Sequence, residues 1–561
     1  MKWTPLAITL ALALGAANLT PHHAIAATAA AQAQPFLWQN ATVYFLLTDR
    51  FNNASKSNDH AYGRKDDAAP LRGYMGGDLA GVTAKIKDGY FDSLGVNVIW
   101  ISPPVEQIHA GVDEGSGKSY AFHGYWARDW TAVDANLGTE QDMRDLVDAA
   151  HARGIRVLLD VVMNHTGPVT KDDPVWPADW VRTGPPCTYK DARTTIECTL
   201  VQNLPDVRTE SNDNVALPPA LVAKWKAEGR YDREMAELDD FFARTGYPRA
   251  PRYYLMKWHA DWIRKYGVDG FRVDTVKHVE ASVWQELHTV ATAAYEDWKR
   301  ANPSKKISDD PFFMTAEVYN YTVASGLQFT MDGGQQVNFY EHGFDSMINF
   351  GLARDANLDY ETLFSRYSSQ LNGALSGRSV LNYLDSHDDE RPFDAARRKP
   401  FESANKLLLA PGAAQIYYGD ETARRLDVAD ARGDARLRSF MNWDELARNA
   451  ARDGYTVAEV RQYWSRLGLF RQAHVAVGAG VHQQLQAQPY VFKRTYDKNG
   501  ISDKVVVALD LPTDRASVID LHGVFADGEK VKDYYSGESA LVTGGKVRFD
   551  ARNALLLIGR E

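Results

Sequence analysis

Eight short apolar segments recur along the middle of the chain, and each is followed by polar residues and then by a stretch of helical character. The segments are Val43–Leu47, Val96–Ile101, Ile155–Val162, Gly270–Asp274, Phe312–Glu317, Phe344–Phe350, Val380–Asp385 and Ala414–Tyr418. Continuous apolar strands that alternate with helices are typical of parallel sheets buried on both faces. Eight such units predict an α/β fold built on a closed (β/α)8 TIM barrel.

Polar residues cluster where these predicted strands end. They are Asp160, Asn164, His165, Asp274, Glu317, His387 and Asp388. In a parallel barrel the carboxyl ends of all strands meet at one mouth, where functional residues gather. We therefore expect these side chains to lie together, far apart though they are in the sequence.

With 561 residues, the chain is too long for one ordinary core. We assign residues 34–165 and 251–474 to the barrel. The segment 166–250 is Pro-rich, holds both cysteines and is too long for a simple loop, so it predicts an irregular lobe inserted after the third strand. Short strand-like runs separated by turns over 475–561 predict a C-terminal antiparallel β-sandwich.

The first residues have the pattern of a secretory signal. Lys2 supplies the charge, 6–17 the apolar run, and 24–26 (Ala-Ile-Ala) a cleavage site, with 31–33 (Ala-Gln-Ala) as a second. The run is short for a membrane anchor. We expect a signal peptide over 1–33, cleaved near 26–34, and export to the periplasm or the medium.

Composition limits the class of partner. A formal net charge of −10 argues against nucleic acid or an anionic membrane surface. The 14 Trp, 27 Tyr and 22 Phe fill cores, and they also supply the flat faces on which sugar rings pack. In an oxidising compartment Cys187 and Cys198 are expected to form a disulfide; two free thiols are the alternative, and two cysteines alone disfavour a zinc site.

Three acidic residues at the predicted mouth have different surroundings. Arg272 and Asp274 share one face of a strand, so the guanidinium would keep the carboxylate ionised, as a nucleophile requires; a structural ion pair is the alternative. Glu317 ends an apolar strand, where low polarity raises a carboxyl pKa and favours a general acid. With Asp388 as a third carboxyl, the set matches the needs of glycosidic cleavage.

Seven motifs in order resemble those of glycoside hydrolase family 13, the α-amylase family. They are Gly95–Pro103, Asp160–His165, Leu204–Asp206, Gly270–His278, Ala316–Val318, Leu384–Asp388 and Pro411–Glu421. The resemblance implies that Asp274 is the nucleophile, Glu317 the acid/base and Asp388 the stabiliser of the transition state. The reaction would retain anomeric configuration, which predicts a separation of ~5–5.5 Å between the carboxyls of Asp274 and Glu317.

The same resemblance implies a set of substrate-binding residues. They are Arg272, His165 and His387, which would contact the sugar at the cleaved position, Tyr125, which would stack on it, and Lys277 and His278, which would contact the leaving-group side of an α-1,4-glucan. We expect an α-glucan substrate and a monomeric protein.

Calcium is the metal that the resemblance implies. A first site would use Asn164, Asp206 and the His278 carbonyl, with Glu197 as a candidate fourth ligand. A second candidate site resembles the N-terminal calcium loop of the glucanotransferases and would use Asn53, Ser55, Asn58, Asp59, Gly76 and Asp78. Asn53 and Ser55 stand where that branch commonly has Asp and Asn, and a polar turn without metal is the alternative.

An exported, endo-acting α-amylase is the leading hypothesis. One alternative is a cyclodextrin glucanotransferase, although those enzymes typically carry further β domains after the first sandwich. Another is a maltooligosaccharide-forming or cyclodextrin-degrading relative, which often has an extra N-terminal domain. A third is an inactive member that acts as a binding subunit, which the presence of all three carboxyls disfavours.

Overall fold

The structure is a computed structural model that describes residues 35–113, 115–389 and 391–561. The expected signal peptide, 1–33, lies outside these residues. Within them, no helix combines the length and the apolar character that crossing a bilayer requires.

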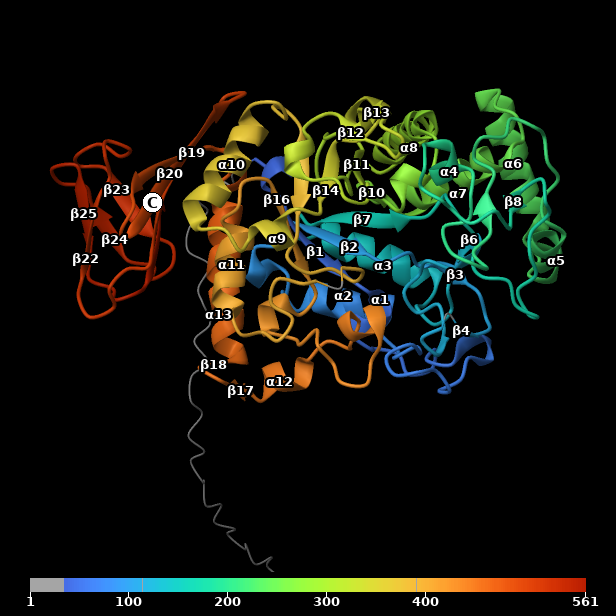
Figure 1. The fold of residues 1–561 in the computed structure, drawn as a ribbon, viewed down its shortest axis with the longest axis horizontal. Helices are drawn as coiled ribbons and strands as arrows, with labels where there is room; N and C mark the ends of the chain where they lie inside the picture. The colour runs from blue at the N-terminus through green and yellow to red at the C-terminus, as the bar shows by residue number, and fades with distance from the viewer. Residues whose placement is uncertain (1–34, 114, 390) are drawn as a thin grey trace, which may run out of the picture. The chain divides into compact units, whose positions relative to one another are not determined.

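Eight parallel strands close into a barrel, which confirms the predicted fold (Figure 1). In barrel order they are β1 (Thr42–Leu46), β16 (Ala413–Tyr417), β15 (Ser379–Asn382), β14 (Ser346–Asn349), β11 (Phe313–Ala316), β10 (Gly270–Val273), β7 (Arg156–Val161) and β2 (Val98–Ile101). Each strand falls within or beside one of the eight apolar runs, and all their residues are buried. The register places Arg272 of β10 opposite Asp160 of β7.

Helices cover the outside of the barrel. They are α2 (Leu79–Lys87), α3 (Glu140–His151), α7 (Pro251–Tyr266), α8 (Ala281–Ala301), α10 (Tyr360–Asn372), α11 (Pro400–Leu408) and α13 (Val457–Ala473). Local signals set their limits: Thr139 and Asp142 form a capping box on α3, and Gly267 ends α7 with φ +79°. Shorter elements are α1 (Thr48–Phe51), α9 (Leu352–Asp355), α12 (Trp443–Ala447), α14 (Ala476–Ala479), β12 (Phe329–Thr330), β13 (Gln336–Val337), β17 (Ala451–Arg452) and β18 (Tyr455–Thr456).

Two excursions extend over the mouth. The first follows β2 and contains β3 (Val105–Gln107), β4 (Val112–Asp113), β5 (Lys118–Ser119) and β6 (Ala127–Val133). The second is the lobe after β7, with β8 (Val181–Arg182), α4 (Arg193–Ile196), β9 (Asp206–Val207), α5 (Pro219–Ala227) and α6 (Tyr231–Thr245). The first half of the lobe is irregular, as predicted, but its second half holds the two helices α5 and α6, which the predicted irregular lobe did not include.

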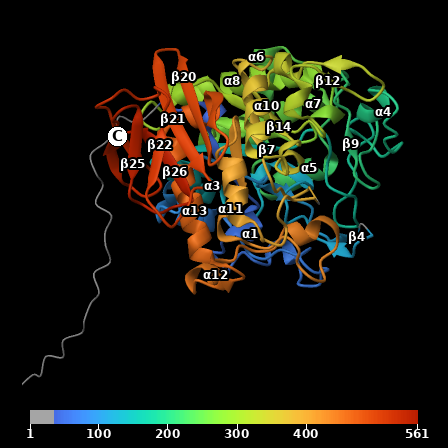
Figure 2. The same cartoon turned by 60° about the vertical axis from the view of Figure 1, so that its left-hand side comes forward.

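A C-terminal antiparallel structure confirms the predicted β-sandwich (Figure 2). Its larger sheet has the order β19 (Val481–Gln486), β20 (Tyr490–Lys498), β21 (Ile501–Leu509), β26 (Leu555–Arg560), β23 (Lys530–Asp533) and β24 (Ser539–Leu541). β22 (Ser517–Asp520) pairs with β25 (Lys546–Phe549). A buried apolar cluster that includes Val506, Ile519, Val547 and Leu556 joins the two sheets.

The predicted disulfide between Cys187 and Cys198 is present. It closes a loop of the lobe that carries Tyr189 and Thr195. His278 Nδ1 donates a hydrogen bond to the Thr195 carbonyl oxygen at 2.8 Å, so the loop contacts the mouth of the barrel directly.

Candidate active site

Arg272 lies at the centre of the barrel mouth. Its Nη1 is 2.9 Å from Asp160 Oδ1 and 2.8 Å from Asp274 Oδ1, and its Nη2 is 2.8 Å from Glu317 Oε2. The guanidinium is buried, with 1% of the side chain exposed. One cation therefore joins three carboxyls at the ends of the adjacent strands β7, β10 and β11. The structure thus brings Asp274 and Glu317 together, as their places at strand ends predicted.

Glu317 has the surroundings of a proton donor. Its Oε2 also accepts a hydrogen bond from the Thr275 backbone N–H at 3.0 Å, and 15% of its side chain is exposed. Burial raises the pKa of Glu317 well above its ordinary value; Arg272 opposes this, and the charges of Asp274 and Asp388 add to it. A carboxyl whose pKa is raised keeps its proton to higher pH, which a group that protonates a leaving oxygen requires.

Asp388 follows β15 and lines the same cavity as Glu317. Its Oδ1 accepts a hydrogen bond from Arg438 Nη2 at 2.5 Å, and its Oδ2 lies 2.9 Å from His387 Nε2. Burial opposes ionisation, but His387 and Arg438 outweigh it and hold the pKa of Asp388 below its ordinary value. With 51% of the side chain exposed, the carboxylate is ionised and accessible to a ligand.

Two cavities meet at Glu317. A cavity of about 800 Å³ is lined by Trp100, Arg272, Glu317, His387 and Asp388 among others. A second, of about 410 Å³, has Glu317 in common with it and is lined further by Tyr189, Lys277, His278 and Asp332. Tyr319, with 54% exposed, also faces both. Glu317 thus lies where the two cavities join.

Two of the predicted substrate residues, His387 and His165, pack against Tyr125. Its ring stacks on His387 with centroids 5.2 Å apart, and its hydroxyl donates to Asp160 Oδ2 at 2.7 Å. His165 Nε2 lies 3.1 Å from the Tyr125 carbonyl oxygen. Burial lowers the pKa of His165, which favours a neutral imidazole that can hydrogen-bond to hydroxyl groups. Burial also lowers the pKa of His387, and the neighbouring Asp388 carboxylate opposes that effect.

Lys277 and His278 line the smaller cavity and belong to a short 3-10 helix, Val276–His278, which follows β10 and Asp274. Lys277 Nζ lies 3.5 Å from Asp332 Oδ2, on the loop between β12 and β13. Burial lowers the pKa of His278 to about 4. The structure therefore places Arg272 and His387 on the larger cavity and Lys277 and His278 on the smaller one.

Two residues of the site had no role assigned from the sequence. Asp160 binds Arg272, Tyr125 and Trp100 Nε1, the last at 3.1 Å, and burial raises its pKa to about 7, with Asp274 adding and Arg272 opposing. Its position at the end of an apolar strand was a usable signal. Arg438 follows the 3-10 helix Gly433–Leu437, and nothing in its local sequence marks it.

The three predicted ligands of the first calcium site converge. The side-chain amide of Asn164 lies with one terminal atom 3.0 Å from the His278 carbonyl oxygen and 3.1 Å from Asp206 Oδ1. Turned with its oxygen inward, the amide completes a set of three oxygens of the kinds that Ca²⁺ binds. Burial, with Glu210 and Glu280 adding and Arg182 opposing, raises the pKa of Asp206 to about 9, so a cation there would replace a proton. Glu197 instead pairs with Arg193 at 3.1 Å.

The second candidate set is only partly available. The amide oxygens of Asn53 and Asn58 are buried without a partner, and Asn53 Nδ2 donates to Asp59 at 3.0 Å. Gly76 faces Asn53 and Asp59 so closely that a Cβ would clash with both. Ser55 Oγ lies 2.9 Å from Ser57 Oγ, and Asp78 caps α2 through the Gly81 N–H. Among described residues, no three His, Cys, Asp or Glu side chains cluster as metal ligands, so both sites depend on amide or carbonyl oxygens.

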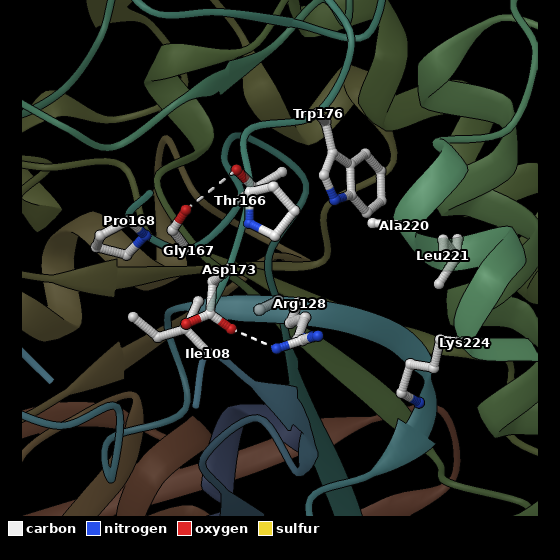
Figure 3. A pocket seen from close by; sticks show the side chains of 12 residues that line it. Ile108, Arg128, Thr166, Gly167, Pro168, Asp173, Trp176, Ala220, Leu221 and Lys224 are labelled. Atoms are coloured by element: carbon white, nitrogen blue, oxygen red, sulfur yellow. Dashed lines mark hydrogen bonds and ion pairs between the residues drawn. The ribbon is translucent and has the colours of Figure 1, made fainter. Parts of the chain in front are cut away.

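A small cavity between β6 and α5 is separate from the site (Figure 3). Figure 3 shows Arg128 directed at Asp173, and the two pair at 2.5 Å. Lys224, on its other wall, is 2.8 Å from Glu106 and 2.7 Å from Asp129. With about 30 Å³, the cavity holds little more than a water molecule, and we assign it no ligand.

Comparisons with known proteins agree with this geometry. The model of the family "Alpha amylase, catalytic domain" matches residues 45–477. The periplasmic alpha-amylase of Escherichia coli (strain K12) is 38% identical, over 84% of this chain and 72% of that protein. A cyclomaltodextrin glucanotransferase of Bacillus sp. (strain 1011) is 28% identical, and the match covers 53% of its length.

Solved structures share the fold. An Anoxybacillus alpha-amylase matches with a TM-score of 0.64 at 23% identity, over 94% of this chain and 99% of that one. The predicted family is confirmed by the model that spans most of the chain. The chain belongs to the α-amylase family of glycoside hydrolases.

Proposed function

We propose that the chain is an exported, retaining α-amylase that cleaves internal α-1,4-glucosidic bonds of starch and maltodextrins. The observation that carries this proposal is the arrangement of Arg272, which binds Asp274 and Glu317 with two nitrogens of one guanidinium. The name of the Escherichia coli relative supports the same activity and the periplasm as location.

In the proposed first step, the Asp274 carboxylate attacks the anomeric carbon and forms a glycosyl ester. Glu317 gives its proton to the glycosidic oxygen as the bond between that oxygen and the anomeric carbon breaks. In the second step Glu317, now ionised, takes a proton from water. The water oxygen attacks the anomeric carbon and frees Asp274, and the two inversions together retain configuration.

The ionised Asp388 would stabilise positive charge on the sugar ring during both steps. Tyr125, His165 and His387 would bind the sugar that becomes attached to Asp274. Lys277 and His278, in the second cavity, would bind the sugar that leaves. The carboxyl separation of ~5–5.5 Å stays a prediction that a structure with bound substrate analogue can test.

Calcium is part of the proposal. Asn164, Asp206 and the His278 carbonyl would hold one Ca²⁺ between the lobe and the barrel, where it would fix the segment that carries Lys277. A second ion would use Asn53, Asn58, Asp59 and Gly76, while Ser55 and Asp78 would first have to leave their present partners. The test measures the melting temperature of chelator-treated protein before and after Ca²⁺ is restored. Comparing this response in N164A, in N53A and in the unmodified protein would show how many sites bind Ca²⁺.

Activity on amylose is the direct test of the function. Purified protein with calcium should release linear reducing oligosaccharides, and D274N and E317Q should not. Cyclic products would favour the glucanotransferase alternative, which relatives at 28% identity keep open. If the protein binds maltooligosaccharides but releases no product from any α-glucan, the inactive binding subunit would be favoured.

Export and oligomeric state are also proposals. Residues 1–33 would be removed on secretion, and the mature chain would be a monomer. Mass spectrometry of protein recovered from the periplasm and the medium would locate the new N-terminus, and light scattering would give the mass in solution. A mature protein that keeps residues 1–33, or a dimer, would contradict these statements.

A further inference from the structure

We infer that Arg438 is the positioning residue for Asp388, the carboxylate that braces the sugar. The inference rests on the proposed function of Asp388. Arg438 is distant in sequence from every predicted catalytic residue and reaches the site from the loop that follows β16. It contacts the Asp388 carboxylate and is not among the residues that line the two cavities, so we expect it to act through Asp388.

The contact between the two residues is the firmest that Asp388 makes. Arg438 Nη2 donates to Asp388 Oδ1 at 2.5 Å, and Arg438 Nε donates to the His387 carbonyl at 3.0 Å. His387 Nε2 is also near Asp388, at 2.9 Å, but neither ring nitrogen of His387 makes an aligned hydrogen bond. Arg438 therefore fixes both the side chain of Asp388 and the backbone immediately before it.

Arg438 is itself held from several directions. The carbonyls on either side of it, Leu437 and Ser439, accept hydrogen bonds from Tyr417 at 3.0 Å and from Tyr418 at 2.7 Å. Arg438 Nη2 is 2.7 Å from Asp434, which in turn is 3.0 Å from Arg72. A buried side chain with fixed backbone and a second ionic partner gives a rigid reference point for a carboxylate that is half exposed.

This rigidity matters because the other side-chain neighbour of Asp388, His387 Nε2 at 2.9 Å, makes no aligned hydrogen bond with it. The Asp388 backbone N–H donates to the Ser386 hydroxyl at 3.2 Å, and the Asp388 side chain lines the larger cavity. Without Arg438, the carboxylate could rotate into solvent. A catalytic group that is misplaced by about 1 Å typically costs about 10²-fold in rate.

The test compares R438A and R438K with the control R432A, which removes an exposed arginine of the same loop. We expect R438A to lose about 10²-fold in kcat on maltoheptaose, with KM within about threefold, because substrate binding outside the cleaved position is intact. R438K should recover part of the loss. Millimolar guanidinium chloride should raise the kcat of R438A and leave the kcat of R432A unchanged.

The outcomes separate the inference from the proposed function. A kcat of R438A within threefold of the unmodified enzyme would overturn the inference. A loss that neither lysine nor guanidinium restores, together with a lower melting temperature, would assign Arg438 to fold stability and also overturn it. D388N provides the reference: if D388N keeps full activity, the proposed role of Asp388 fails, whereas an inactive D388N beside a fully active R438A refutes only the inference about Arg438.

Discussion

Replacement of Arg272 by methionine tests the electrostatic core of the site. The guanidinium is 1% exposed and contacts Asp160, Asp274 and Glu317 at 2.8–2.9 Å. Methionine keeps the packing volume but leaves three buried carboxyls without their shared cation. Loss of one partner of a buried ion pair typically costs 3–5 kcal/mol, so we expect R272M to lose about that much of its free energy of unfolding at neutral pH.

The loss of free energy of unfolding in R272M should increase with pH. Burial already raises the pKa of Asp160 to about 7, with the charge of Asp274 adding and Arg272 opposing. A carboxyl whose folded-state pKa exceeds its unfolded value of about 3.9 destabilises the fold as pH rises from the lower value to the higher. Without Arg272 the pKa of Asp160 rises further, so the gap in stability between R272M and the unmodified enzyme should widen from pH 5 to pH 8.

Denaturant unfolding at pH 5 and pH 8, together with amylose hydrolysis, measures both effects. R494M is the matched control, because Arg494 is equally buried but donates to the carbonyls of Leu409 and Val477 near the C-terminal sheet. It should lower stability almost equally at both pH values and keep kcat. If R272M unfolds like the unmodified enzyme at pH 8, or keeps its activity, the proposed electrostatic role of Arg272 is refuted.

Three further predictions concern pH, metal and the lobe. Because burial raises the pKa of Glu317, activity should fall on the alkaline side only well above the ordinary glutamate value of about 4.3, and a pH profile of kcat/KM that falls near 4–5 would contradict this. Chelation should lower the melting temperature, added Ca²⁺ should restore it, and N164A should abolish the response; an identical response in N164A would exclude the first site. The disulfide joins residues 11 apart in sequence, so C187S/C198S should lose about 3 kcal/mol of stability and raise KM through the loop that contacts His278; an unchanged KM would show that this loop does not shape the site.

The barrel could be predicted because its strands are encoded locally. Each is a continuous apolar run with a polar end, and the closed parallel arrangement then places those ends together whatever their distance along the chain. The convergence of Asp274 and Glu317 at the barrel mouth was predictable for this reason. The helices α5 and α6 were missed although Pro219 and Gly246 carry ordinary start and stop signals, because the surrounding prolines and glycines suggested irregular structure.

Other parts of the site depend on packing between distant segments. Arg438 reaches Asp388 because Tyr417, Tyr418 and Arg424 hydrogen-bond to the residues on either side of it. No sequence pattern in 424–442 predicts that contact. The second calcium set shows a related limit. A motif can list Ser55 and Asp78 as ligands, but it cannot show that Asp78 is already engaged as the N-cap of α2.

Trapping of the glycosyl-enzyme tests the central claim most directly. E317Q treated with an activated maltosyl fluoride should form the ester but hydrolyse it slowly, because the general base for the second step is missing. Mass spectrometry of the digested protein should find one added maltosyl group on Asp274, and none in the D274N/E317Q double variant. A label on another residue, or a product of inverted configuration released without any intermediate, would contradict the account.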